Sequence, residues 1–163
     1  IALNCSAPLL LTHHFANEMA KQGTGNILFV SSIVAFQGVP LIANYAATKA
    51  YLLTFAEGLA LELAPKGVNV SIAAPGFTNT NLAAQMDFTS TPIKPLEANY
   101  VASYTLNKLG KKRIIIPGFI NKLLFVLGKR LQSRAFNSRA FGQVFKTVLG
   151  KKLAQEDAHQ HVA

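Results

Sequence analysis

A serine, a tyrosine and a lysine in the segment "SSIVAFQGVPLIANYAATK" have the types and spacing needed for proton transfer. Tyr45 and Lys49 are four residues apart, so a helix would place them on one face. A free phenol with a pKa near ~10 is a poor acid–base catalyst at neutral pH, but a nearby ammonium stabilises the phenolate and lowers that pKa. Ser32 lies thirteen residues before Tyr45 and could donate its hydroxyl to a carbonyl oxygen that the tyrosine protonates.

The surrounding sequence predicts helices and strands in alternation. Helices are expected where apolar residues recur at helical spacing between Gly or Pro stops, and strands where short apolar runs are continuous. The expected helices are 3–21, 44–63 and 95–109, and the expected strands are 26–32, 67–76 and 112–118. This order predicts a parallel α/β sheet with right-handed crossovers.

The candidate residues fall where such sheets bind ligands, beyond the carboxyl ends of the strands. Ser32 closes the first expected strand, and Pro75-Gly76 closes the second. Thr78 and Thr80 follow that second strand and supply further hydroxyls at the same edge.

The combined pattern resembles the short-chain dehydrogenases/reductases. The landmarks are a strand ending in Ser31-Ser32, a YxxxK helix from Tyr45 to Lys49, and a strand ending in Pro75-Gly76 with threonines after it. The resemblance is close over residues 1 to about 82 and looser to Gly118, and it is nearest to bacterial-type members. It implies the C-terminal part of a doubly wound, Rossmann-type parallel sheet over residues 1–118.

The resemblance also implies a role for each matching residue in an NAD(P)-dependent oxidoreductase that acts on a carbonyl/alcohol pair. Tyr45 would be the general acid/base, Ser32 would orient the substrate oxygen, and Lys49 would hold the nicotinamide ribose and lower the tyrosine pKa. The remaining implied residues are Asn4, which anchors a water in the proton relay; Pro75, Gly76 and Thr78 in the nicotinamide pocket; and Met86 and Phe88 as apolar contacts of the substrate. No metal site is expected.

The family's dinucleotide-binding features are absent from this sequence. No trio of glycines fits GxxxGxG, and no NNAG-like segment occurs. We therefore expect a C-terminal portion of a longer reductase that by itself neither binds the cofactor tightly nor turns over substrate. The preference for NAD or NADP is not determined by these residues. The alternative is a truncated, non-catalytic module for interaction or for binding at a membrane surface.

Positive charge is concentrated toward the C-terminus of this +9 chain. Residues 98–155 contain twelve Lys or Arg and no Asp or Glu. Residues 119–154 are predicted to be a basic, amphipathic helical extension, followed by a disordered tail at 155–163. The extension could cap the sheet and wall the substrate pocket, or residues 119–152 could adsorb to an anionic membrane surface.

Other partners follow from composition and from the resemblance. One cysteine and no apolar run of about 20 residues favour a cytoplasmic protein, with peripheral attachment to a membrane as the alternative. Nucleic acid is not expected, because no recognition motif is present and the phenylalanines follow the helical period. The resemblance implies a homodimer that associates through the two helices flanking the site.

Overall fold

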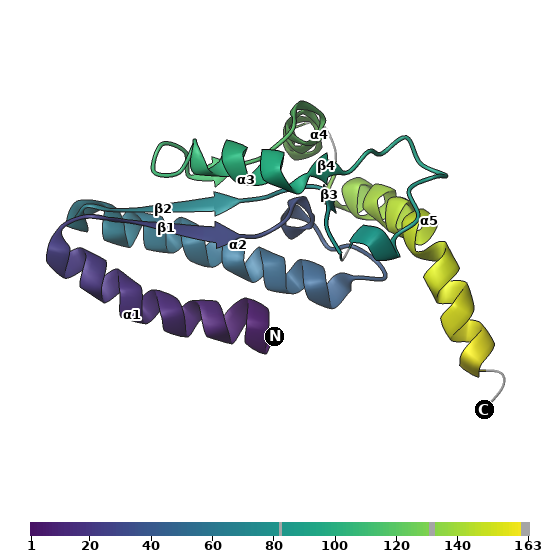
Figure 1. Ribbon diagram of the computed structural model, residues 1–163, viewed down its shortest axis with the longest axis horizontal. Coiled ribbons are helices and arrows are strands. Elements are labelled where there is room, and N and C mark those ends of the chain that lie inside the picture. Colours follow the sequence, from purple (N-terminus) through teal and green to yellow (C-terminus); the bar gives the residue numbers. More distant parts are fainter. Residues whose placement is uncertain (82, 131–132, 161–163) are drawn as a thin grey trace.

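The computed structural model describes residues 1–81, 83–130 and 133–160, and its centre is a three-stranded parallel sheet (Figure 1). The strands are β1 (Gly25–Val30), β2 (Val68–Ala73) and β5 (Ile114–Ile115), in the order β1-β2-β5. β1 and β2 are in register from Gly25 opposite Val68 to Val30 opposite Ala73. This parallel register aligns their carboxyl ends, and with them the segments expected to form the site.

Helices α1 (Ala7–Gln22) and α2 (Ala43–Leu63) cover one face of the sheet (Figure 1). A π-helical turn, Ala2–Ser6, precedes α1. The main core lies between these helices and the strands, where Leu52 and Ala56 of α2 and Ile72 of β2 are almost completely buried. Small alanines at positions 56 and 60 bring α2 close to the sheet, which fixes the helix that carries Tyr45 and Lys49.

Of the remaining helices, α3 (Ala98–Leu106) and α4 (Phe119–Arg130) lie on the opposite side of the sheet, and α5 (Arg134–Gln160) runs past the carboxyl ends of the strands (Figure 1). Phe145 and Val148 of α5 are buried against Val34, Val39 and Ala46, which forms a second apolar cluster beside the carboxyl ends of the strands. The basic extension therefore packs against the region of the candidate site.

The predicted α/β class and parallel sheet are confirmed, with differences at the element boundaries. The helix expected at 95–109 begins only at Ala98, because Leu96–Glu97 (β4) pairs in parallel with Thr78–Asn79 (β3). The strand expected at 112–118 pairs only over Ile114–Ile115. Helix α5 continues through 155–160, which the sequence predicted to be a disordered tail, while 161–163 lie outside the described residues. Within the described part of the chain, no helix is both long and apolar enough to cross a membrane.

Candidate active site

Ser32 is held between the ends of two neighbouring strands. It follows β1 in an extended conformation and caps the short 3-10 helix Ile33–Phe36, accepting a hydrogen bond from the Val34 N–H at 3.4 Å. Its hydroxyl lies 3.4 Å from the Pro75 carbonyl oxygen, to which it donates. The serine is thus oriented by the loop after β1 and by the loop after β2.

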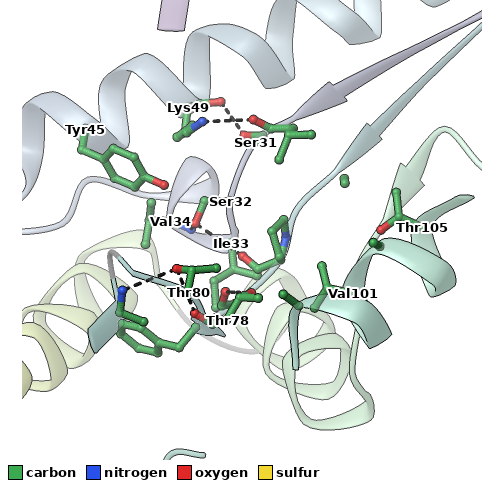
Figure 2. A pocket seen from close by; sticks show the side chains of 18 of the residues that line it. Ser31, Ser32, Ile33, Val34, Tyr45, Lys49, Thr78, Thr80, Val101 and Thr105 are labelled. Atoms are coloured by element: carbon green, nitrogen blue, oxygen red, sulfur yellow. Dashed lines mark hydrogen bonds between the residues drawn. The ribbon is translucent and has the colours of Figure 1, made fainter. Parts of the chain in front are cut away.

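Tyr45 and Lys49 project from one face of α2 toward the loop that carries Ser32 (Figure 2). The Lys49 Nζ donates to the Val30 carbonyl oxygen at 3.0 Å and lies 5.6 Å from the centroid of the Tyr45 ring. Ser31 donates to the backbone oxygen of Lys49 at 2.8 Å. These two bonds tie α2 to the end of β1, so the three candidate side chains occupy one small region.

Burial controls the electrostatics of this region. Partial burial raises the pKa of Tyr45 above its ordinary value, and a hydrogen bond with the Ser32 hydroxyl opposes the rise. Burial also lowers the pKa of Lys49, because desolvation disfavours its charged form. The net shift of the Tyr45 pKa is upward, because desolvation of the phenol outweighs the hydrogen bond with Ser32, while the Lys49 ammonium donates to the Val30 carbonyl oxygen. The lowering of this pKa by Lys49 stays a prediction.

A cavity of about 680 Å³ opens in front of these side chains. Ser32, Tyr45 and Lys49 line it together with Thr78 and Thr80 from the loop after β2 (Figure 2). Most of the remaining wall is apolar and consists of Leu28, Val30, Ile33, Val34, Ile42, Ala73, Phe77, Ala83, Met86, Ala98, Val101, Ala102, Leu106, Phe141 and Phe145. The cavity therefore offers a few hydroxyls and one ammonium in an otherwise apolar space, as small-molecule sites commonly do.

The loop after β2 contributes Pro75, Gly76 and Thr78 to the same cavity. Thr78 donates to the Gly76 carbonyl oxygen at 3.1 Å. Any residue other than glycine at position 76 would force the Asn121 side chain on α4 to move, because a Cβ at position 76 would lie 2.6 Å from Oδ1 of Asn121. The helical extension thus packs directly on this loop.

Two predicted site residues lie outside the cavity wall. Asn4 donates to the Thr48 hydroxyl at 3.2 Å, and Thr48 donates to the Tyr45 carbonyl oxygen at 2.8 Å. Asn4 is therefore connected through Thr48 to the backbone of Tyr45 on α2. Phe88 contacts the cavity residue Phe77 edge-to-face, with ring centroids 5.0 Å apart, whereas Met86 does line the cavity.

The sequence missed several cavity residues because their partners are distant in the chain. Phe141 and Phe145 belong to the extension that was expected to wall the substrate pocket or to adsorb to a membrane, but the sequence did not single out these two residues as part of the wall. Val101 and Thr105 reach the cavity from α3, on its far side (Figure 2). The Thr105 hydroxyl is buried and has no hydrogen-bond partner within the described residues.

Comparison with known proteins assigns the chain to a family. Residues 1–90 match the family model described as short chain dehydrogenase, and the chain belongs to this family. A 3-oxoacyl-[acyl-carrier-protein] reductase, FabG, of Aquifex aeolicus (strain VF5) is 40% identical over 84 residues, which are 52% of this chain and 34% of that protein.

Solved structures extend the similarity beyond the matched residues. One comes from a study of 7beta-hydroxysteroid dehydrogenase stereoselectivity and has a TM-score of 0.74 at 28% identity, covering 85% of this chain and 54% of the other. A short-chain dehydrogenase from Sphingobium yanoikuyae in complex with NADPH has a TM-score of 0.63 at 26% identity, covering 82% and 56%. The chain thus spans about a third of the curated relative and about half of each solved structure.

Proposed function

We propose that this chain supplies the catalytic part of a nicotinamide-dependent oxidoreductase that interconverts a carbonyl compound and its alcohol. The observation that carries the proposal is the convergence of Ser32, Tyr45 and Lys49 on one wall of an apolar cavity at the carboxyl ends of β1 and β2. Family membership and the NADPH-bound structural relative support the same chemistry.

Lys49 and the loop after β2 fit a nicotinamide nucleotide. The Lys49 ammonium uses one N–H on the Val30 carbonyl, and its two others suit the hydroxyls of a ribose. Tyr45, Pro75, Gly76 and Thr78 border the same space, with Thr78 as the hydroxyl for a carboxamide. Such a nucleotide supplies or accepts the hydride when bound. Either NAD or NADP is compatible with these residues.

Tyr45 carries the proton in this proposal. During reduction, hydride adds to the carbonyl carbon and the Tyr45 phenol gives its proton to the oxygen; oxidation reverses both transfers. The Ser32 hydroxyl gives up its long, 3.4 Å hydrogen bond to the Pro75 carbonyl oxygen, donates instead to the same substrate oxygen, and holds that oxygen in line with the phenol. Asn4 connects to α2 through Thr48, which suits a residue that anchors a water on the path by which Tyr45 is reprotonated.

The walls of the cavity favour a bulky, apolar carbonyl or alcohol. Phe77, Phe141 and Phe145 surround the space in front of Tyr45, and Met86 adds a flexible apolar side chain. No carboxylate lines this cavity among the described residues, so the site offers nothing complementary to a cationic substrate. The hydroxysteroid dehydrogenase study among the structural relatives concerns a substrate of this bulky, apolar class.

A pair of tyrosine variants on one helix tests the proposal. In the natural gene product, Tyr45→Phe removes the phenolic hydroxyl with its transferable proton, so turnover of ketones with reduced nicotinamide nucleotide should fall by ~10² or more. Tyr51→Phe is the matched control, because Tyr51 lies on α2 outside the cavity and stacks on Phe55. Nucleotide binding should be nearly equal in the two variants. Equal turnover in both would remove Tyr45 from the reaction.

A further inference from the structure

Helix α4 leaves several large apolar side chains exposed, and one of them, Leu124, also borders a cavity that Leu53 and Glu57 of α2 line. Its outward side chains, here called the α4 apolar face, are Phe119, Ile120, Leu123, Leu124 and Val126. Phe119 is 80% exposed and Ile120 is 70% exposed. Phe136, at the start of α5, is also more than half exposed. A contiguous group of large apolar side chains left in water indicates an interaction site.

The inner face of α4 fixes this orientation. Asn121 donates to the Pro117 carbonyl oxygen at 2.9 Å, and the Phe125 ring lies 4.4 Å from the Phe36 ring, centroid to centroid. Farther along, Asn137 of α5 donates to the Gly128 carbonyl oxygen at 3.0 Å. The helix is therefore anchored to the catalytic domain through a polar residue, one aromatic ring and a glycine. Its more apolar side points outward.

The charged residues of α4 and of the first part of α5 are all basic, and Glu57 of α2 is the one acidic residue that borders the cavity shared by Leu124 and Arg134 among the described residues. Lys122 on α4 and Arg134, Arg139 and Lys146 on α5 form no ion pair within the described residues. Over residues 98–155 the sequence has twelve basic residues and no acidic one. An anionic surface could accept these cations and the adjacent apolar side chains together.

The dimensions of α4 suit adsorption rather than insertion across a bilayer. Twelve residues make a helix of about 18 Å, shorter than the ~30 Å hydrocarbon layer. A short helix with exposed Phe and Leu, next to Lys and Arg, lies in the interface with its apolar side chains among the acyl chains. A second copy of the chain would instead place two sets of these cations against each other.

We propose that α4 and the beginning of α5 form a docking surface for an anionic lipid bilayer. The α4 apolar face enters the boundary between headgroups and acyl chains, and Lys122, Arg134 and Arg139 contact lipid phosphates. This inference does not depend on the oxidoreductase activity.

Vesicle flotation of the natural gene product tests the docking surface. Vesicles of phosphatidylcholine alone are compared with vesicles that contain equal parts of phosphatidylcholine and phosphatidylglycerol. The protein should float with the anionic vesicles and lose most of this binding in high salt. Leu123→Glu/Leu124→Glu should lower the partition coefficient by about tenfold or more, and Lys122→Gln by about fivefold at low salt.

Matched controls use exposed residues elsewhere. Leu41→Glu in the loop before α2 and Lys66→Gln beyond the end of α2 make the same chemical changes away from this surface and should leave partitioning unchanged. Thermal unfolding verifies that each variant is folded. No flotation with anionic vesicles would overturn the proposal. Equal flotation of the wild type and the α4 leucine variant would also overturn it. A change in the oligomeric state of that variant with unaltered vesicle binding would assign the face to contact with a second copy of the protein instead.

Discussion

Gly76→Ala tests whether the helical extension and the loop after β2 form one packed unit. An alanine Cβ would lie 2.6–2.8 Å from the side-chain amide atoms of Asn121, well inside van der Waals contact. Asn121 would have to rotate and give up its 2.9 Å hydrogen bond to the Pro117 carbonyl oxygen. Losing that bond costs ~1 kcal/mol, and residual overpacking adds ~1 kcal/mol or more. We expect the free energy of unfolding to fall by about 2 kcal/mol in total.

A double-mutant cycle measured by urea unfolding separates this contact from other effects. In an Asn121→Ala background the obstructing amide is gone, so Gly76→Ala should cost at least about 1 kcal/mol less than in the wild type. Gly58→Ala in α2 is the control, because a Cβ there meets nothing within 4 Å and the substitution should stabilise the helix by ~0.5–1 kcal/mol. An identical cost for Gly76→Ala in both backgrounds would refute the proposed packing.

Two further predictions concern the cavity wall and the phenol. Phe145→Ala removes a side chain that is 5% exposed, so it should lower the free energy of unfolding by ~3–5 kcal/mol and raise KM for apolar ketones. Gln143→Ala, on the exposed side of α5, is the control and should change neither quantity. Equal effects of the two substitutions would contradict the assignment of Phe145 to the cavity. Burial raises the Tyr45 pKa, so the folded chain keeps the phenolic proton at a pH where the unfolded chain loses it. The protonated Tyr45 therefore stabilises the fold fully below about pH 10, and this stabilisation is lost as the pH rises through the pKa of the folded state. In ultraviolet titrations without nucleotide, Tyr45→Phe should remove a phenolate transition above pH ~10, and loss of a transition at or below that value would contradict the burial argument.

Much of the fold was predictable because the residues that end its helices and precede its strands can be recognised locally in the sequence. Gly23 and Gly67 adopt positive φ values of 72° and 73° just before β1 and β2, so each turn from helix to strand is visible as a glycine before an apolar run. The spacing of Tyr45 and Lys49 is likewise a property of one helix. The meeting of Ser32 with this pair follows from parallel strand order, which the helix–strand alternation already predicted.

The unpredicted features depend on contacts between distant segments. The pairing of Thr78–Asn79 with Leu96–Glu97 is two residues long and leaves no periodic pattern. The positions of Phe141 and Phe145 on the cavity depend on how α5 crosses the site, and the raised pKa of Tyr45 depends on burial rather than on the nearby lysine. The Asn121–Gly76 contact joins α4 to the loop after β2 and has no signature in either segment.

The most direct measurement of the proposed chemistry is a crystal structure of the natural gene product with a nicotinamide nucleotide and a bulky ketone or alcohol. The reacting oxygen should lie within hydrogen-bond distance, about 2.6–3.2 Å, of both the Tyr45 hydroxyl and the Ser32 hydroxyl. The Lys49 ammonium should contact the ribose. A reacting oxygen placed away from Tyr45 and Ser32, with the nucleotide bound, would contradict the assigned roles.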